Sequence, residues 1–254
     1  MPNHEIYGLV GRALGHSWSA SYFADFFART GRDAEYRNFE IADLASEFPV
    51  LIDSTPQLRG LNVTIPYKQQ IIPLLDALSP EAQAVGAVNV ITIEPRAGRR
   101  PLLTGHNTDI IGFRETIREL ISGGNHRSAL VLGNGGASRA VCHGLRQLGV
   151  SPVVVSRTPE AGQLGYADLT PDVMHSHTVI VNTTPLGMWP NTDAMPSVPL
   201  DLVDSRHVCY DLVYNPDPTL WLRECSRRGA AVCSGLAMLH RQADAAWKIW
   251  QGVR

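Results

Sequence analysis

Apolar residues in the second half of the chain form short, nearly continuous runs that are separated by segments with helical spacing. Continuous apolar runs are typical of parallel strands that are covered on both faces. The repeated alternation of strand and helix therefore predicts a doubly wound parallel sheet. The predicted strands are 129–132, 152–155, 177–181, 207–212 and 230–233, and the predicted helices are 137–148, 219–228 and a last helix after Gly235.

The first half also alternates strands and helices, but it carries more polar residues at the strand ends. We expect strands at 6–10, 36–41, 58–65 and 86–93, with 102–104 pairing back onto the last of these. Tyr22, Phe23, Phe26 and Phe27 recur at helical spacing and predict a helix that ends before Gly31. Further helices are expected through Leu44 and Phe48, through 71–75, and over 110–121.

A linker-like stretch at 122–126 and the change in pattern near Asp109 indicate two domains. The fold class expected is α/β, with an N-terminal α/β domain and a C-terminal Rossmann-type, doubly wound domain. The last helix has an apolar stripe at 239, 243, 246, 247 and 250 that must pack on another part of the chain. We expect it to pack back on the first domain. The boundaries expected are 1–108, 109–235 and 236–254.

Composition limits the classes of partner. The 254 residues are 44% apolar and 18% charged, as in a globular protein, and the net charge of −2 argues against nucleic acid or an anionic membrane as the main partner. No apolar run is long enough to span a bilayer, and residues 1–5 lack the features of a signal peptide. The expected location is the cytoplasm. The four cysteines lack C-x-x-C spacing and are interpreted as reduced thiols, and no metal site is expected.

A glycine-rich turn follows the first strand of the second half. Its pattern is G-x-G-G-x-x-x-A from Gly133 to Ala140. Glycines allow a sharp turn and close approach to a pyrophosphate, whose charge is met by the free N–H groups of a helix N-terminus. An ordinary glycine turn is the alternative, but the surrounding strand and helix alternation favours dinucleotide binding. The expected cofactor-binding residues here are Gly133, Asn134, Gly135, Gly136 and Ala137.

The end of the next strand bears on which dinucleotide is bound. It is Ser156-Arg157-Thr158, without the acidic residue that binds the ribose hydroxyls in NAD-preferring domains. A guanidinium suits a 2′-phosphate, so NADP is favoured over NAD, although a surface arginine without this role is the alternative. Later loops at the same sheet edge add Thr183, Leu212 and Gly235 to the expected cofactor residues.

Polar residues in the first half gather where ligands bind in α/β proteins. Asn62, Thr64 and Lys68 surround the end of a predicted strand. Ser17 and Ser19 lie on a loop that leads into a helix, where one serine can be an N-cap and two hydroxyls can hold a small carboxylate. Alternatively, Lys68 is a solvated lysine at the start of a helix, and Asp109 is a helix N-cap. A small carboxylate is therefore one possible ligand.

These segments together resemble the shikimate dehydrogenase family along essentially the whole chain. The resemblance rests on Gly15–Ser19, Gly60–Lys68, Gly86–Asn89, Gly105–Gly112, the glycine-rich turn, Ser156–Thr158, Asn182–Met188, Tyr214–Pro216 and Gly235–Gln242. It implies NADPH-dependent reduction of 3-dehydroshikimate to shikimate, on the route to chorismate and the aromatic amino acids. It also implies that the first domain binds the substrate.

The resemblance implies a role for each matching residue. Ser17 and Ser19 would hold the substrate carboxylate, with Tyr214 close by. Asn62, Thr64, Asn89, Asp109 and Gln242 would bind the ring hydroxyls, and Lys68 with Asp109 would form the catalytic pair. Hydride addition turns a ketone into an alkoxide, so a lysine ammonium at that oxygen can stabilise the charge and deliver the proton.

The chain departs from the family pattern at three places. Ala20 stands where proline commonly follows the second serine, Ser156 replaces the usual asparagine, and Pro159, Glu160 and Ala161 leave no second basic residue near Arg157. The size of the preference for NADP over NAD is therefore open. A quinate/shikimate dehydrogenase that uses NAD, or a ligand-sensing relative without turnover, are the alternative functions. The oligomeric state expected is monomer or homodimer.

Overall fold

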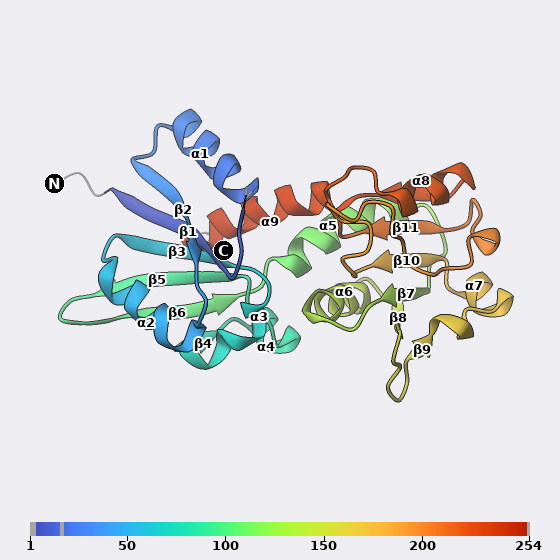
Figure 1. The fold of residues 1–254 in the computed structure, drawn as a ribbon, viewed down its shortest axis with the longest axis horizontal. Helices are drawn as coiled ribbons and strands as arrows, with labels where there is room; N and C mark the ends of the chain where they lie inside the picture. The colour runs from blue at the N-terminus through green and yellow to red at the C-terminus, as the bar shows by residue number, and fades with distance from the viewer. Residues whose placement is uncertain (1–3, 16–17, 253–254) are drawn as a thin grey trace. The chain divides into compact units, whose positions relative to one another are not determined.

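The computed structural model describes residues 4–15 and 18–252 and folds into two compact units (Figure 1). Unit 1 comprises Met1–Thr108 and Ala243–Arg254, and unit 2 comprises Asp109–Gln242. Each unit is built around a six-stranded sheet. Helix α9 (Gly235–Trp250) belongs to unit 2 through its first half and to unit 1 through its second half. The mixed α/β class expected from the sequence is confirmed.

The sheet of unit 1 is mixed, with the strand order β2-β1-β3-β5-β6-β4. Strands β1, β2 and β3 run parallel, whereas β5 runs antiparallel to both β3 and β6. The carboxyl ends of β1, β3 and β6 therefore share one edge with the start of β5. The bounds are Glu5–Gly11 (β1), Ala34–Glu40 (β2), Leu58–Val63 (β3), Ala77–Leu78 (β4), Val90–Arg96 (β5) and Arg99–His106 (β6).

Helices cover both faces of this sheet. Alternate residues of β1 face opposite sides of the sheet: Ile6 and Val10 belong to one apolar core, and Tyr7 belongs to another. The first core is closed by α2, whose buried residues include Phe48, and the second by α1 together with the end of α9. The helical bounds are Trp18–Thr30 (α1), Leu44–Ser54 (α2), Tyr67–Gln70 (α3), Ile72–Leu74 (η1) and Pro80–Val85 (α4).

An aromatic cluster fixes the end of α9 against the sheet of unit 1. The rings of Tyr7 and Trp250 lie 4.9 Å apart, and Trp250 Nε1 donates a 3.0 Å hydrogen bond to the carbonyl of Ile91. Gly60 makes this approach possible, since a Cβ at that position would lie 2.2 Å from Trp250 Nε1. The expectation that the last helix packs back on the first domain is confirmed for its C-terminal half.

Two elements of unit 1 differ from the sequence-based prediction. Instead of one helix over 71–75, the chain forms the short α3 and a 3₁₀ turn that contains Pro73. Proline has no N–H for a helical hydrogen bond, which explains the interruption. The strand predicted at 86–93 begins only at Val90, because α4 ends at Gly86, which caps the helix at φ 66°.

The sheet of unit 2 is entirely parallel and has the order β12-β11-β10-β7-β8-β9. Taken in chain order this is the 3-2-1-4-5-6 arrangement of dinucleotide-binding domains, with the reversal of direction between β7 and β10. The doubly wound sheet expected from the sequence is confirmed. The bounds are Ser128–Leu132 (β7), Ser151–Ser156 (β8), Leu164–Gly165 (β9), Val179–Asn182 (β10), Val208–Asp211 (β11) and Ala231–Cys233 (β12).

Alternate residues of the central strands face two separate cores. Val131 packs with residues of α5, α6 and α9, whereas Leu132 packs with residues of α7 and α8. Helix α9 approaches α5 closely at Gly112, where a Cβ would lie 2.7 Å from the carbonyl oxygen of Met238. The bounds are Asp109–Ile121 (α5), Gly136–Gln147 (α6), Pro171–Ser176 (α7) and Leu220–Arg227 (α8), with 3₁₀ turns at Tyr166–Asp168 (η2) and Leu200–Leu202 (η3).

The cysteines form no disulfide bond among the residues that the structure describes. All four cysteines are free, and Cys142, Cys209 and Cys225 are buried. Within 4–15 and 18–252, no helix combines the length and apolar character that crossing a membrane requires. The same ranges hold no group of three or more His, Cys, Asp or Glu side chains arranged to bind a metal ion.

Gly60→Ala tests the packing of α9 on the sheet of unit 1. The new methyl group would collide with the Trp250 indole, so we expect a loss of about 1–3 kcal/mol in the free energy of unfolding, measured by urea denaturation. Gly123→Ala is the control, because a Cβ there meets nothing within 4 Å. In a Trp250→Ala background the Gly60 substitution should cost far less. An equal cost in both backgrounds would contradict this packing.

Candidate functional site

The glycine-rich turn of unit 2 joins β7 to α6 at the carboxyl edge of the sheet, beside the point where the strand order reverses. Gly133 has φ +107°, a conformation that side-chain-bearing residues rarely adopt, and its missing Cβ would lie 2.9 Å from Thr183 Oγ1. Gly135 caps α6 without a side-chain hydrogen bond to its first amides. A Cβ on Gly135 would meet nothing within 4 Å, so the backbone there is open to a ligand.

The segment that follows β8 lies at the same edge. The Ser156 side chain is buried, accepts a hydrogen bond from the Thr158 N–H and donates one to the Thr158 carbonyl, each at 3.2 Å. These bonds hold a tight turn with Arg157 exposed at its tip. Burial raises the pKa of the nearby Tyr166, and the positive charge of Arg157 partly opposes this shift. Arg157 is therefore held in place by its backbone while its guanidinium stays accessible.

A buried carboxylate holds the loops after β10 and β11. Asp211 Oδ1 accepts hydrogen bonds from Asn182 Nδ2 (2.9 Å) and from the Val213 N–H (3.0 Å), and Oδ2 accepts one from Thr219 Oγ1 (2.7 Å). Thr219 is also the N-cap of α8. Burial raises the pKa of Asp211 to about 6, although all three of these bonds lower it. One side chain thus connects two loops with the start of a helix.

The other cofactor candidates lie around this group. Thr183 Oγ1 donates a 2.6 Å hydrogen bond to the carbonyl of Leu132, at the end of β7. Gly235 follows β12, and a Cβ there would lie 2.2 Å from the Leu212 carbonyl oxygen. The structure therefore gathers all eleven predicted cofactor residues at the carboxyl ends of β7, β8, β10, β11 and β12. An uncapped helix start, an open glycine backbone and an accessible guanidinium fit the pyrophosphate and the 2′-phosphate of NADP.

Three predicted substrate residues belong to unit 2. Asp109 is the first residue of α5 and is buried, and Gly112 lies one turn further along the same helix. The Cγ of Gln242 would lie 2.9 Å from a Cβ on Gly112, so Gln242 on α9 is close to the turn that begins with Asp109. Tyr214 follows β11 and is 40% exposed.

The polar residues of unit 1 meet at the carboxyl edge of its sheet. Asn89, just before β5, is buried and forms a reciprocal pair with Thr108: Asn89 Oδ1 accepts from the Thr108 N–H at 2.8 Å, and Nδ2 donates to Thr108 Oγ1 at 3.1 Å. Asn107 Nδ2 donates to the carbonyl of Ala87 at 3.0 Å. These contacts lock the segment before β5 to the end of β6.

Lys68 and Thr64 are held by backbone contacts at this edge. The Thr64 N–H donates to the Val10 carbonyl, and the Thr64 carbonyl accepts from the Tyr67 N–H, both at 2.9 Å. The Lys68 carbonyl accepts a 2.7 Å hydrogen bond from the Val88 N–H, which ties α3 to the segment that carries Asn89. The main chain of Lys68 is thus fixed next to a predicted substrate residue.

The Tyr36 hydroxyl lies beside Ser19 and Asn62 at this edge. Tyr36 OH donates to Asn62 Oδ1 at 2.7 Å, and Asn62 Nδ2 donates to the Asn89 carbonyl at 3.3 Å. The Ser19 side chain lies near the Tyr36 hydroxyl and lowers its pKa, against the larger opposite effect of burial. The structure therefore brings together Ser19, Asn62, Thr64, Lys68 and Asn89. Ser17 lies outside the described residues.

Sequence reasoning did not single out Tyr36 or Asp211. Tyr36 was predicted only as part of a strand, and Asp211 only as part of the strand 207–212 and of the loop next to the cofactor. Tyr36 reaches a partner 26 residues away across an intervening strand, so its role depends on the strand order β2-β1-β3. The signal for Asp211 is a carboxylate that ends an otherwise apolar strand, a position that requires several hydrogen-bond donors.

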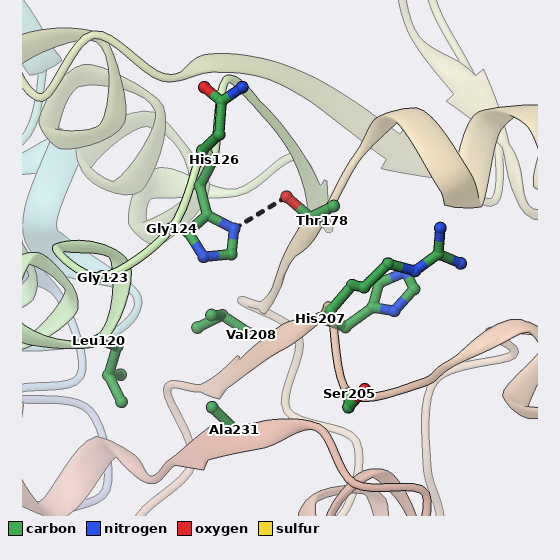
Figure 2. A pocket seen from close by; sticks show the side chains of 11 residues that line it. Leu120, Gly123, Gly124, His126, Thr178, Ser205, His207, Val208 and Ala231 are labelled. Carbon is green, nitrogen blue, oxygen red and sulfur yellow. Dashed lines mark hydrogen bonds between the residues drawn. The ribbon is translucent and has the colours of Figure 1, made fainter.

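A cavity of about 490 Å³ opens at the opposite, amino-terminal edge of the sheet of unit 2 (Figure 2). His126 and Thr178 line it just before β7 and β10, and their side chains are joined by a 2.8 Å hydrogen bond between Nδ1 and Oγ1. His207, also in its wall, accepts from the Asp204 N–H through Nδ1 and donates to the Met174 carbonyl through Nε2. Each of these side chains has a hydrogen-bond partner within unit 2, and none of them belongs to a predicted site.

Comparisons with known proteins point to one family. A family model described as the shikimate dehydrogenase substrate binding domain matches residues 9–91. Shikimate dehydrogenase (NADP(+)) of Moorella thermoacetica is 38% identical over 97% of this chain and 88% of the relative.

Solved structures give the same result. Shikimate 5-dehydrogenase from Thermus thermophilus, crystallised with NADP(H) and shikimate, has a TM-score of 0.82 and 31% identity over 98% of this chain and 94% of that one. Quinate dehydrogenase from Corynebacterium glutamicum, in complex with NAD, has a TM-score of 0.84 and 27% identity over 98% and 94% of the two chains.

The raised pKa of Asp211 predicts how stability depends on pH. Because the folded protein holds this proton more tightly than the unfolded chain, the free energy of unfolding should fall as the pH rises from 3.8, the ordinary pKa of an aspartate, to about 6. Relative to Asp211→Asn, the wild-type protein should lose about 2–3 kcal/mol between pH 4 and pH 7 in urea unfolding. Asp201→Asn, at an exposed position, is the control. If the difference in the free energy of unfolding between wild type and Asp211→Asn does not change with pH, the raised pKa of the buried Asp211 is contradicted.

Proposed function

The chain belongs to the shikimate dehydrogenase family, and we propose that it catalyses the reversible NADPH-dependent reduction of 3-dehydroshikimate to shikimate. The observation that carries the proposal is the set of polar residues at the carboxyl edge of unit 1, on a chain that also has the glycine-rich turn of a dinucleotide-binding sheet. Each unit contributes its own half of the chemistry, one for a hydroxylated acid and one for a dinucleotide.

Unit 2 supports binding of NADP. The first amides of α6 can meet the pyrophosphate, since Gly135 supplies no side chain that competes for them. Arg157 is exposed at the tip of the turn held by Ser156 and can pair with a 2′-phosphate through its planar fork. Thr183, Leu212 and Gly235 line the same edge. When bound, NADPH supplies the hydride that reduces the ketone.

Unit 1 supports binding of a small hydroxylated acid. Ser17 and Ser19 are proposed to hold the carboxylate with neutral hydroxyl donors, and Tyr214 to assist them. Asn62, Thr64, Asn89 and Gln242 are proposed to bind the ring hydroxyls. In unit 1 the amides are already oriented by protein partners, as Asn89 is by Thr108, so little side-chain freedom is lost when a ligand binds.

Lys68 is proposed to act on the reacting oxygen. The chain has 22 basic residues, and only Lys68 and Lys248 among them are lysines. Arginine supplies the same charge but cannot release a proton in a protein, whereas lysine can exchange one with an alkoxide. A lysine at this position therefore matches a role that includes proton delivery as well as charge stabilisation. Asp109 is proposed to bind a substrate hydroxyl and to act with Lys68 as the catalytic pair.

Two other functions remain as alternatives. A quinate/shikimate dehydrogenase that uses NAD is favoured by one observation, the exposed Glu160 three residues after Arg157, whose carboxylate repels a 2′-phosphate. A ligand-sensing relative without turnover would have no need of Lys68 or Asp109. Location in the cytoplasm and a monomeric or homodimeric state stay predictions from the sequence.

Lys68→Ala tests the catalytic role. Loss of the ammonium group should lower kcat by about 10²- to 10⁴-fold, because both charge stabilisation and proton transfer in the transition state are removed. The KM for shikimate should change little, since the hydroxyl and carboxylate contacts stay in place. Steady-state oxidation of shikimate with NADP measures both constants.

Lys248→Ala is the matched control, because it removes the only other lysine from an exposed position on α9. It should leave kcat unchanged. Lys68→Arg separates the two contributions, since it keeps the positive charge but cannot transfer a proton. Near-normal turnover of Lys68→Ala would refute the assignment of this residue.

Arg157→Ala tests the recognition of the 2′-phosphate. Loss of a charge-assisted contact to phosphate should raise the KM for NADP by about 10- to 100-fold. The KM for NAD, which has no such phosphate, should stay within experimental error of the wild-type value. Arg118→Ala on the exposed side of α5 is the control. Equal increases for NADP and NAD would show that Arg157 does not act on the phosphate.

A further inference from the structure

The hydroxyl of Tyr36 lies where three elements of unit 1 meet. Tyr36 is on β2, and its hydroxyl donates a 2.7 Å hydrogen bond to Asn62 on β3, across the intervening β1. It also lies near the side chain of Ser19, in the first turn of α1, which lowers the pKa of the Tyr36 hydroxyl. Tyr36 pairs in register with Tyr7, and Asn62 with Leu9, so both face the side of the sheet that α1 covers. One hydroxyl therefore lies beside two of the proposed substrate residues.

Two hydrogen bonds, one from Tyr36 and one to the Asn89 carbonyl, fix how the Asn62 amide is turned. An amide has an accepting oxygen and a donating nitrogen, and a 180° rotation exchanges them. The tyrosine hydroxyl donates to Oδ1, while the Asn89 carbonyl can only accept and so requires Nδ2 on its side. Among the residues that the structure describes, no partner takes the second Nδ2 proton. Asn62 is therefore held as a donor toward a ligand oxygen.

The ring of Tyr36 is itself held firmly. It stacks on Phe23 of α1 with centroids 4.8 Å apart and an angle of 11° between the planes. Phe23 is buried and packs in turn against Trp250 at the end of α9. Burial raises the pKa of Tyr36, so its hydroxyl stays protonated and remains a donor across the physiological range. The hydroxyl thus has a fixed position and a fixed hydrogen-bonding role.

We propose that Tyr36 is a positioning residue of the substrate site, which sets Asn62 as a hydrogen-bond donor to a substrate hydroxyl and places Ser19 beside it. The inference rests on the proposed function, because Asn62 and Ser19 are substrate residues only if the chain binds shikimate. Tyr36 acts through these two residues, so its contribution is to substrate binding, equally in the ground state and in the transition state.

Tyr36→Phe removes the hydroxyl and keeps the ring stacked on Phe23. Without this donor the Asn62 amide is held on one side only, by its 3.3 Å hydrogen bond to the Asn89 carbonyl, and its Oδ1 is left without its protein partner. We expect the KM for shikimate to rise by about 5- to 10-fold, as for the loss of one neutral hydrogen bond, while kcat and the KM for NADP stay close to the wild-type values. Steady-state kinetics provide all three constants, and far-UV circular dichroism confirms that the variant is folded.

Two further variants make the test specific. Tyr22→Phe is the control, since it removes from α1 a tyrosine hydroxyl that donates a 2.6 Å hydrogen bond to Asp244. In an Asn62→Ala background, Tyr36→Phe should have a much smaller effect than in the wild type, because the amide that it orients is gone. If the two substitutions act independently, the KM of the double variant will rise by the product of the two single fold-changes. That result would overturn the inference.

The outcomes separate the inference from the proposed function. Active wild-type protein with an unchanged KM for shikimate in Tyr36→Phe would overturn the positioning role and leave the function intact. A fall in kcat with no change in KM would also overturn it, because a binding role predicts the opposite. Wild-type protein without shikimate dehydrogenase activity would overturn the proposed function, and this inference with it.

Discussion

Buried polar groups must be hydrogen-bonded, and this constraint shapes the functional edge of both sheets. In unit 2 the Asp211 carboxylate, which is fully buried, is met by Asn182, the Val213 amide and Thr219. Satisfying one charge therefore holds two loops and the start of α8 in a single arrangement. These loops carry Thr183 and Leu212. The position of these proposed cofactor residues therefore depends on Asp211, which has no proposed role in binding the cofactor or the substrate.

Unit 1 meets the same constraint with neutral amides. Asn89 and Thr108 satisfy each other, and Asn62 is satisfied by Tyr36 on one side and by the Asn89 carbonyl on the other. The amides are consequently oriented before a ligand arrives, as binding of a small, highly hydroxylated molecule requires. A shift of any one member would leave its neighbour with an unpaired buried group, which costs about 1–3 kcal/mol. The proposed substrate residues therefore behave as one connected unit.

Local sequence patterns predicted most of the fold and much of the site. The continuous apolar runs of unit 2 identified its parallel sheet, and the glycines from 133 to 136 located the turn before α6, because both depend on neighbours in the chain. The helix expected over 71–75 was wrong, since Pro73 outweighed the apolar spacing. Tyr36 could not be identified as part of the site, because its contact with Asn62 depends on β1 lying between β2 and β3. The register of distant strands is a tertiary property that no local pattern contains.

In the proposed function, these two sets of oriented residues bind 3-dehydroshikimate and NADPH and carry out the reduction. Steady-state oxidation rates of the wild-type protein with shikimate and with quinate, each in the presence of NADP and of NAD, test this function. We expect the highest kcat/KM for shikimate with NADP. A higher kcat/KM for quinate, or for NAD as the cofactor, would contradict the account in favour of a quinate/shikimate dehydrogenase, and no turnover in any of the four combinations would contradict it altogether.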